Sequence, residues 1–312
     1  MKGTDVEVME RAPEAQPALV IVPPSRAEVL RRRALAAAKE ICWYLVVLTV
    51  CAFILLPVSW MLTAALKPDL APIYTVTPQW FPSHAWNWNN FYRAMVYPLF
   101  PFLRYMINTL FVVFANILGI LISCSLVAYP FARMKFRFRE PLFYLLIITM
   151  LVPWQSLVVP QFFFFYHLGW YGTYLPLIVP AFGGNAFFIF LIRQYIRSIP
   201  KELDEAARVD GLNYFQIYWR IILPLSVPVL TVCAVFTFIW NWNNLLGPLL
   251  YLNNNNQFTI AIGLANMFQN SANSKTNLLM AANLLSMIPP AIVFLVIQKR
   301  LIGGIATLGL KG

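Results

Sequence analysis

The sequence predicts an all-α, polytopic membrane protein with six transmembrane helices. Two bulk observations point to a membrane: 60% of the residues are hydrophobic and only 11% are charged, whereas soluble domains are typically about 45–50% apolar and about 25% charged. The third observation is that apolar residues form long uncharged runs without alternation of apolar and polar positions. Such runs are typical of helical spans and not of a membrane β-barrel.

The first expected spans are single crossings. Residues 41–66 and 105–132 contain no Asp, Glu, Lys or Arg, and a helix needs about 20 apolar residues to cross about 30 Å of hydrocarbon. Residues 141–192 are uncharged for too long to cross once. They must fold back, and "HLGWYG" at 167–172 is the expected break.

The last expected spans follow the same reasoning. Residues 221–274 are again too long for one crossing; the fifth span lies before the polar run "NNNNQ" at 253–257, which is the expected break, an exposed turn. Residues 276–298 form the sixth span. An even number of crossings places both termini on one side of the membrane.

The basic residues indicate which side that is. With a cytoplasmic N-terminus, the inner segments hold nineteen Lys and Arg and the outer segments four, as the positive-inside rule requires. This placement accounts for the net charge of +11, since basic residues at helix ends reach anionic lipid headgroups. We therefore expect membrane lipids, and not a nucleic acid, as the partner of these charges. We expect a multi-pass membrane protein with both termini in the cytoplasm.

Two regions divide the chain. Residues 1–40 are rich in Ala, Pro, Glu and Arg without a periodic apolar face, which predicts a loosely ordered cytoplasmic tail. They do not form a signal peptide, because the following apolar run of 26 residues exceeds the roughly 7–15 of a cleavable segment. Residues 41–312 form the six-span domain, with a cytoplasmic loop at about 193–223.

The sequence carries no pattern for catalysis or metal binding. The two histidines, His84 and His167, stand far apart, and no nucleophile and base can be paired around them. The C-terminal "GIATLGLKG" resembles a phosphate-binding loop superficially, but Leu310 stands where Lys must follow the second Gly. We expect no enzyme activity and no bound cofactor.

The spans also lack the groups of a self-powered carrier. Proton- and sodium-coupled carriers usually place ionisable residues inside their spans, and the expected spans here contain none. Sodium can still be held by carbonyls and hydroxyls, so a self-contained secondary carrier or channel remains the alternative function. A membrane scaffold without transport is a further alternative.

An acidic segment interrupts this apolar chain at "KELDEAARVDG", residues 201–211. Its carboxylates gather in the first turns of an expected helix, where they complement the helix dipole, and Gly211 suits the left-handed residue that stops it. Leu203, Ala206, Ala207 and Asp210 fall on one stripe at i, i+3, i+4 and i+7. A second short helix is expected at 213–222, ending at Pro224.

The acidic helix predicts a protein partner. A helix resting on lipid headgroups has a basic face with bulky apolar residues below, whereas this helix is acidic with alanines on its stripe. Helix-in-groove docking is the matching mode of recognition. The expected contact residues are Glu202, Leu203, Glu205, Ala206, Ala207, Asp210 and Gly211.

The spacing of this segment resembles the EAA loop of ABC importer permeases. Glu205-Ala206-Ala207, Gly211, Ile221 and Leu223-Pro224 stand at the positions of that motif. The segments "LGWYGTYLPLIVPAF", "FLRYMINTL" and "LLSMIPPAIVFLVIQKR" are similar to the carbohydrate-uptake branch, on the side of the maltose-type G permeases. The resemblance covers about residues 41–312 and implies the type I ABC importer permease fold.

The resemblance also implies partners. Such permeases pair as two six-span subunits, usually a heterodimer, and each inserts its EAA helix into one of two cytoplasmic ATPase subunits that bind ATP and Mg. A soluble extracytoplasmic binding protein delivers the sugar. The resemblance assigns Glu205 the acidic contact, Ala206 and Ala207 the close packing, and Gly211 the hinge. The tail "IATLGLKG", with Lys311 and Gly312, is similar to a family tail that reaches the ATPases.

Polar side chains within the spans are the expected substrate contacts. An unpaired amide in hydrocarbon is costly, so Gln155, Asn185 and Asn241 either line a pathway or form hydrogen bonds between helices. Trp and Tyr gather on the outer segments, as they do at membrane interfaces generally. The sequence leaves a sugar, a polyol and a sugar phosphate open as substrates.

Overall fold

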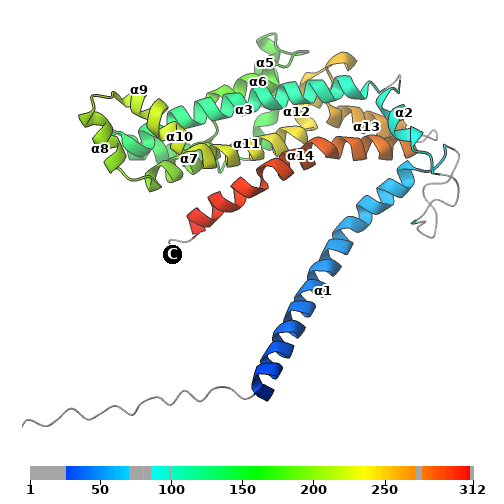
Figure 1. Cartoon of the computed structure of the whole chain (residues 1–312). Helices are drawn as coiled ribbons and strands as arrows, with labels where there is room; N and C mark the ends of the chain where they lie inside the picture. The colour runs from blue at the N-terminus through cyan, green and yellow to red at the C-terminus, as the bar shows by residue number, and fades with distance from the viewer. Residues whose placement is uncertain (1–25, 70–79, 81–85, 98–99, 271–275, 310–312) are drawn as a thin grey trace, which may run out of the picture. The chain divides into compact units, whose positions relative to one another are not determined.

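The computed structural model of the chain (Figure 1) describes residues 26–69, 80, 86–97, 100–270 and 276–309. Throughout these ranges the secondary structure is helical, with turns and short loops between the helices and no strand. The chain divides into two compact units, Met1–Pro57 and Val58–Gly312. The all-helical prediction is confirmed.

The first long helix, α1 (Arg26–Ala65), belongs to the first unit up to Pro57. It begins within the segment that we expected to be a loose tail, so the prediction for residues 26–40 is wrong. The reason is local propensity: this stretch is built from Ala, Leu, Arg, Lys and Glu without Gly or Pro, and these are the strongest helix formers. Residues 1–25 lie outside the described residues.

The second unit is built around α3 (Phe102–Arg133). α7 (Ala186–Ser198), α11 (Val227–Trp242) and α13 (Ile260–Asn270) pack against α3, and α14 (Thr276–Gly309) packs against α11, α13 and α2 (Asn89–Met95). In Figure 1 the short helices α8 and α9 lie at one end of α3 and α2 lies at the other. One end of α3 therefore lies beside the acidic helix α8, and its other end lies beside α2.

The spans agree in number with the sequence prediction. Among the described residues four helices are long and apolar enough to cross a membrane, and the total is six when each of two bent helix pairs is counted as one span. The predicted break after His167 is confirmed, because α5 (Trp154–His167) ends there and α6 (Leu175–Ile178) starts the next span. A 3-10 turn (Val179–Gly183) continues α6 within the span Leu175–Ser198. α12 (Leu246–Tyr251) and a second 3-10 turn (Asn255–Gln257) follow α11 and lie between the candidate spans.

One bend was not predicted. α4 (Arg139–Thr149) and α5 meet at an angle of 93°, whereas the sequence predicted a single third span. Pro153 immediately precedes α5 with an extended ψ of 126°. Proline lacks the N–H that an unbroken helix needs and disfavours helical geometry in the residue before it, so the helix turns here.

The cytoplasmic loop expected at 193–223 contains α8 (Glu202–Val209) and α9 (Tyr214–Ile217). The second short helix, expected at 213–222 and ending at Pro224, is present, because one helical segment runs from Tyr214 to Leu225. The chain continues through a π-helical turn (Tyr218–Ile222) into α10 (Leu223–Leu225) and bends by 72° before α11. A widened π turn leaves room for Pro224, whose missing N–H would interrupt a regular helix.

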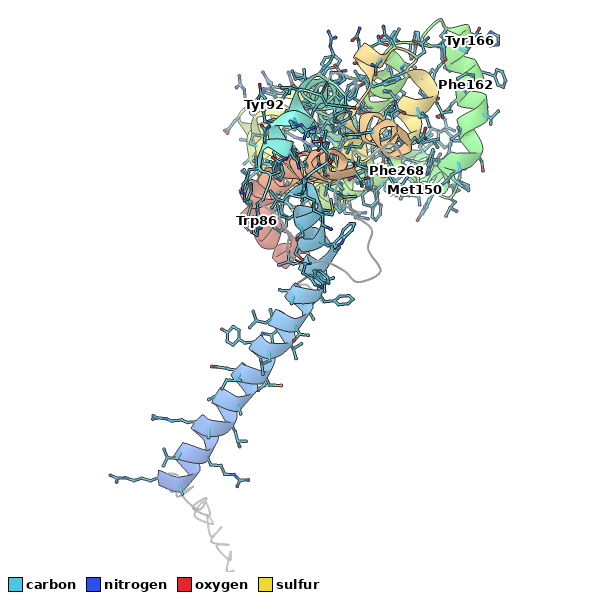
Figure 2. The ribbon with its side chains drawn as sticks, turned by 90° about the vertical axis from the view of Figure 1, so that its right-hand side faces the viewer. Trp86, Tyr92, Met150, Phe162, Tyr166 and Phe268 are labelled. Carbon is cyan, nitrogen blue, oxygen red and sulfur yellow. The ribbon has the colours of Figure 1, made fainter. Side chains whose placement is uncertain are left out.

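Apolar side chains cover much of the exterior of the second unit. Figure 2 shows Phe162 and Tyr166 on α5 and Phe268 on α13 projecting from the ribbon, and Tyr166 and Phe268 are 55% and 63% exposed. Such an extent of exposed apolar surface is foreign to soluble monomers and marks a membrane or protein interface. The exterior agrees with the apolar composition from which the spans were predicted.

Candidate functional site

The acidic segment folds as the sequence predicts, into the short helix α8. Glu202, Asp204 and Glu205 occupy its first turn, where carboxylates complement the unpaired N–H groups of the helix start. Gly211 stops the helix with a left-handed φ of +82°. The N–H groups of Gly211 and Leu212 donate to the carbonyls of Arg208 and Ala207 over 3.0 Å, which is the closing pattern of a glycine-terminated helix.

The next helix begins directly behind this turn. The Asn213 side chain accepts a hydrogen bond from the Gln216 N–H, and the Gln216 side chain accepts one from the Asn213 N–H. This reciprocal capping box starts α9. The Arg208 guanidinium on α8 lies 4.9 Å from the centre of the Tyr214 ring on α9. This side-chain contact joins the two helices across the turn at Gly211.

The side chains of α8 separate into an outer and an inner set. The outer set is exposed and contains most of the expected contact residues, together with one apolar residue that was not singled out: Glu202, Leu203, Glu205, Ala206, Val209 and Asp210. Val209 is 88% exposed. The inner set is Asp204 and Ala207, which are each 5% exposed.

Ala207 is therefore not on the outer surface where the sequence stripe placed it. It belongs to a buried apolar cluster of its own chain, together with Ile196 at the end of α7 and Ile217 on α9. In a short helix the i+4 position can turn toward the scaffold while the i+3 position stays outside. Ala207 fastens α8 to the bundle, and Ala206 is the small residue that remains exposed.

Asp204 faces an arginine at the end of α3. Its Oδ2 atom lies 3.2 Å from Arg133 Nε, and the two side chains are 7% and 2% exposed. Burial raises the pKa of Asp204, while the charges of Arg133 and Arg208 act in the opposite direction. Sequence reasoning counted Asp204 among the carboxylates of the first turns and gave it no role of its own. The residue that could have indicated a buried partner for Asp204 is Arg133, the first cation after the second span.

Two of the three expected pathway residues lie beside one aromatic cluster. Asn185 caps α7, accepting from the N–H groups of Phe187 and Phe188. Both phenylalanine rings lie against Trp240 on α11, with centroids 6.0 and 5.2 Å away, and Asn241 is the next residue. Trp240 is 50% exposed, so this cluster offers an open aromatic face.

The side-chain amides of Asn241 and Asn185, beside this face, each have a hydrogen-bonding group without a partner among the described residues. The Asn241 side-chain NH2 donates to the Thr237 carbonyl over 2.9 Å, and its oxygen has no partner among the described residues. The Asn185 oxygen is occupied by the helix cap, and its NH2 donors are likewise unused within the described part of the chain. Gln155, the third expected residue, is exposed on α5, and no contact joins it to this cluster.

The asparagine run at 253–257 does more than form an exposed turn. Asn108 Nδ2 donates to the carbonyls of Asn256 and Phe258 over 2.9 and 3.0 Å. Arg104 donates to Asn256 and Tyr105 to Asn255. The run therefore holds the start of α3 in place. Clustered amides are unusual beside an apolar span, and this clustering was the sequence feature that could have predicted the contact.

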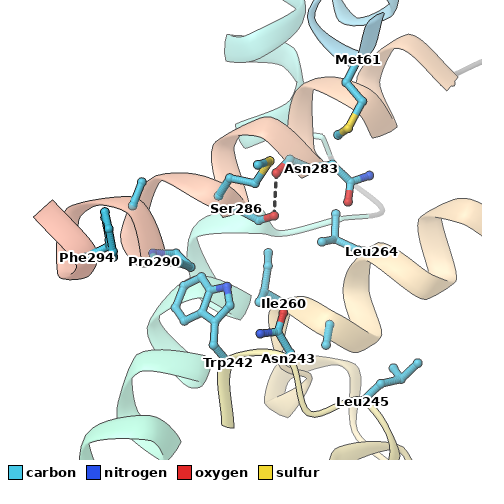
Figure 3. A pocket seen from close by; sticks show the side chains of 13 residues that line it. Met61, Trp242, Asn243, Leu245, Ile260, Leu264, Asn283, Ser286, Pro290 and Phe294 are labelled. Carbon is cyan, nitrogen blue, oxygen red and sulfur yellow. Dashed lines mark hydrogen bonds between the residues drawn. The ribbon is translucent and has the colours of Figure 1, made fainter. Parts of the chain in front are cut away.

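A pocket of about 740 Å³ lies on another side of α11 (Figure 3). Trp242 and Asn243 line it from α11, and Asn283 and Ser286 line it from α14. The Asn243 and Asn283 amides donate to the carbonyls of Ile239 and Leu279, and Ser286 donates to the Asn283 carbonyl. One donor of each asparagine and the serine hydroxyl are thus bonded to backbone, and the walls of the pocket are mainly apolar, with Ile260, Leu264 and Phe294 among its lining residues.

The described residues contain no group of three or more His, Cys, Asp or Glu side chains placed to hold a metal ion. Two surfaces of different chemistry stand out among the described residues. One surface is acidic and lies outside the long apolar helices, and the other is aromatic and lies within the bundle.

The fold is shared with a solved transporter. One chain of the crystal structure of a bacterial ABC transporter involved in the import of the acidic polysaccharide alginate superimposes with a TM-score of 0.70. The alignment covers 89% of this chain and 99% of that chain at 23% sequence identity. The class that the fold defines is therefore a helical membrane protein with the architecture of a chain of that transporter.

The sequence identifies the family within that class. The profile of the family described as binding-protein-dependent transport system inner membrane component matches residues 115–306. The chain belongs to this family. It is a multi-pass, non-catalytic permease of the inner membrane, a kind of subunit that works with a second permease, with separate ATPase subunits and with a binding protein.

Relatives of known designation support the same assignment. The arabinooligosaccharides transport system permease protein AraQ of Halalkalibacterium halodurans is 35% identical over 196 residues, which are 63% of this chain and 69% of AraQ. The sn-glycerol-3-phosphate transport system permease protein UgpE of Yersinia pestis is 32% identical over 206 residues, 66% of this chain and 73% of UgpE. A probable ABC transporter permease protein of Pyrococcus horikoshii, PH1036, is 29% identical over 252 residues, 79% of this chain and 91% of the relative.

Proposed function

We propose that this chain is the permease subunit of an ATP-driven, binding-protein-dependent importer for a carbohydrate. The observation that carries the proposal is α8, an exposed acidic helix with the EAA spacing, in a chain of this family. The carbohydrate class is supported by the relative named for arabinooligosaccharides and by the structural neighbour named for alginate. The relative named for sn-glycerol-3-phosphate makes a sugar phosphate or polyol the nearest variant.

The proposed assembly contains two permease subunits as a heterodimer, two cytoplasmic ATPase subunits and one extracytoplasmic binding protein. ATP and Mg are bound by the ATPase subunits. Both termini are cytoplasmic, because that orientation places α8 and most Lys and Arg residues on the cytoplasmic side. The C-terminal residues Lys311 and Gly312, expected to approach the ATPases, lie outside the described residues.

The outer surface of α8 is the docking surface in this proposal. Glu205 provides the acidic contact, Glu202 and Asp210 add negative charge at the two ends, and the small Ala206 admits a partner backbone. Leu203, which is 41% exposed, adds an apolar anchor. Gly211 fixes the angle at which α8 leaves α9.

Transport follows from differential binding by the ATPases. When ATP draws the two ATPase subunits together, they carry α8 with them as a rigid body. The permease pair then changes from an inward-open to an outward-open arrangement, because the nucleotide-bound partners bind one arrangement more tightly than the other. The permease supplies the pathway and the ATPases supply the free energy.

The open aromatic face at Trp240 is the proposed place of sugar contact. Aromatic rings present a flat apolar surface to the C–H faces of a sugar, and amides bond to its hydroxyl groups. Asn241 supplies an acceptor and Asn185 supplies donors beside Phe187 and Phe188. Gln155 stands apart on α5 and is a weaker candidate for the pathway.

The proposal is tested by Glu205→Lys in the complex co-expressed with its ATPases and binding protein. Charge reversal at a docking contact costs several kcal/mol, so ATPase binding should weaken by more than about 100-fold. Uptake into membrane vesicles should be abolished while the permease still inserts. The matched control is Lys135→Glu, a charge reversal at an exposed residue beyond α3.

A self-contained carrier or channel predicts the opposite result. In that case Glu205→Lys transports normally and uptake by the unaltered chain persists when ATP is withdrawn. Either finding refutes the importer proposal.

A further inference from the structure

Arg133, the last residue of α3, contacts the chain on both sides of the connection between α7 and α8. Its Nη2 atom donates to the Ile199 carbonyl over 2.7 Å, and Ile199 is the residue that ends α7. Its Nε atom lies 3.2 Å from Asp204 Oδ2. One guanidinium therefore holds the end of α7 and the first turn of α8 to the end of α3.

This contact is distinctive for its burial. The Arg133 and Asp204 side chains are 2% and 7% exposed, and among the residues that the structure describes they form the one ion pair that joins α8 to another element. The neighbouring pair of Arg193 and Glu140 joins α7 to α4 instead. Removing one partner of a buried ion pair leaves the other charge uncompensated, so α8 cannot be displaced from α3 without a large penalty.

The opposite end of α3 is also fixed to a separate element. Thr109 Oγ1 accepts a hydrogen bond from the Ile260 N–H over 2.8 Å, at the start of α13. A helix of 32 residues is about 48 Å long. α3 thus runs from the acidic helix at one end to α13 at the other, in contact with α7 and α11 between them.

We propose that Arg133 is a positioning residue that couples α8 to α3, so that movement of α8 displaces α3 and the helices packed on it. The inference rests on the proposed function, in which the ATPases move α8. Docking and transmission are then separate tasks of one helix. The outer carboxylates of α8 meet the ATPase, and its inner carboxylate, Asp204, passes the displacement to the spans through Arg133.

The test uses the complete reconstituted transporter and measures uptake and ATP hydrolysis together. Asp204→Asn keeps the shape of the side chain and removes its charge. We expect this variant to assemble with the ATPases and hydrolyse ATP, while the substrate imported per ATP falls by about tenfold, the range that changes along a coupling route produce. Arg133→Gln should behave in the same way. Lys135→Gln, which removes an exposed cation two positions away, should leave the ratio unchanged.

A charge exchange separates transmission from simple loss of structure. The double variant Arg133→Asp with Asp204→Arg should recover import per ATP to within about threefold of the unaltered transporter, because the contact is restored with its charges reversed. Arg133→Lys, which keeps the charge, should lie between the unaltered protein and Arg133→Gln.

Two results overturn the proposal: normal import per ATP in Asp204→Asn, or loss of ATPase assembly in Asp204→Asn, which would make Asp204 a docking residue. Failure of the proposed function is recognised separately, since the unaltered complex would then show no ATP-dependent uptake at all.

Discussion

Adjacent carboxylates on α8 have opposite surroundings. Asp204 is 5% exposed and lies against Arg133, whereas Glu205 is exposed. Residues that follow one another on a helix are about 100° apart around its axis. A helix of eight residues can therefore present one acid to its own scaffold and the next to a partner, which is why single substitutions here separate docking from attachment.

Trp240 provides a residue-level prediction about substrate. Trp240→Ala should raise the KM for a neutral oligosaccharide by about three- to tenfold, since stacking on an aromatic face contributes about 0.5–1.5 kcal/mol. Vesicle uptake at several substrate concentrations measures this. The control is Trp154→Ala, because Trp154 is 57% exposed on α5 and lies outside the Trp240 cluster. Equal KM changes in the two variants would count against the proposed site.

At this scale the sequence does not predict which side of a helix faces the rest of the chain. The spacing of Leu203, Ala206 and Ala207 identified a shared stripe, but periodicity does not say how far around the helix the scaffold reaches. Ala207 proved to be buried in its own chain and Ala206 exposed. Asn185 was singled out as a polar residue in a span, and its helix-capping bonds appear only once the position of the helix start is known.

At the scale of the element, the junction between α8 and α9 depends on Gly211. A Cβ atom added there meets open space, yet its φ is +82°. Any cost of substitution is therefore conformational and not steric. Gly169 has a φ of +71° and equally open surroundings at the turn after α5, so the chain contains its own matched control.

We predict that Gly211→Ala and Gly169→Ala each lower the free energy of unfolding by about 1–2 kcal/mol, the cost of a left-handed residue with a Cβ atom. Thermal unfolding of the purified chain measures this loss in the free energy of unfolding. Only Gly211→Ala should also reduce import per ATP, because only this turn orients α8. Gly211→Asn should recover import in part, since asparagine tolerates left-handed geometry better than alanine. Identical transport by both alanine variants would show that the junction angle is unimportant.

Elements were predicted best where composition alone decides them. The long spans follow from uncharged runs, because a membrane forces each backbone group into an internal hydrogen bond and so favours helices. Bends were predicted poorly. Pro130 and Pro160 lie inside continuous helices, whereas Pro153 marks a 93° turn, and the difference depends on packing that a single sequence does not encode locally.

At the scale of the whole molecule, the distribution of basic residues predicts the orientation in the membrane. Arg137 and Asn254 are both exposed and lie in segments assigned to opposite sides. In a background without the native cysteines, a membrane-impermeant maleimide applied to intact cells should label Asn254→Cys and not Arg137→Cys. Labelling Arg137→Cys in open vesicles provides the control for reactivity. The reverse pattern in intact cells would invert the proposed topology.

The separation of charged from apolar segments is the part that the sequence predicts most directly. Scarce carboxylates gather in one segment and the expected spans carry no charge, so the composition alone separates the acidic segment from the spans. The connection between the two could not be predicted in this way. Arg133 and Asp204 are 71 positions apart, and no local pattern predicts that they meet.

The π-helical turn at Tyr218–Ile222 has a consequence for the direction in which α8 faces. A π turn contains about one residue more than an α turn, and one residue corresponds to a rotation of about 100°. Because the π turn takes up this extra residue within one turn, deleting a single residue here would give a regular α-helix and leave α9, with α8 attached, at nearly the same angle about the axis of α10. The π turn therefore keeps the azimuth of the acidic helix, whereas one residue deleted from a regular α turn would rotate it by about 100°.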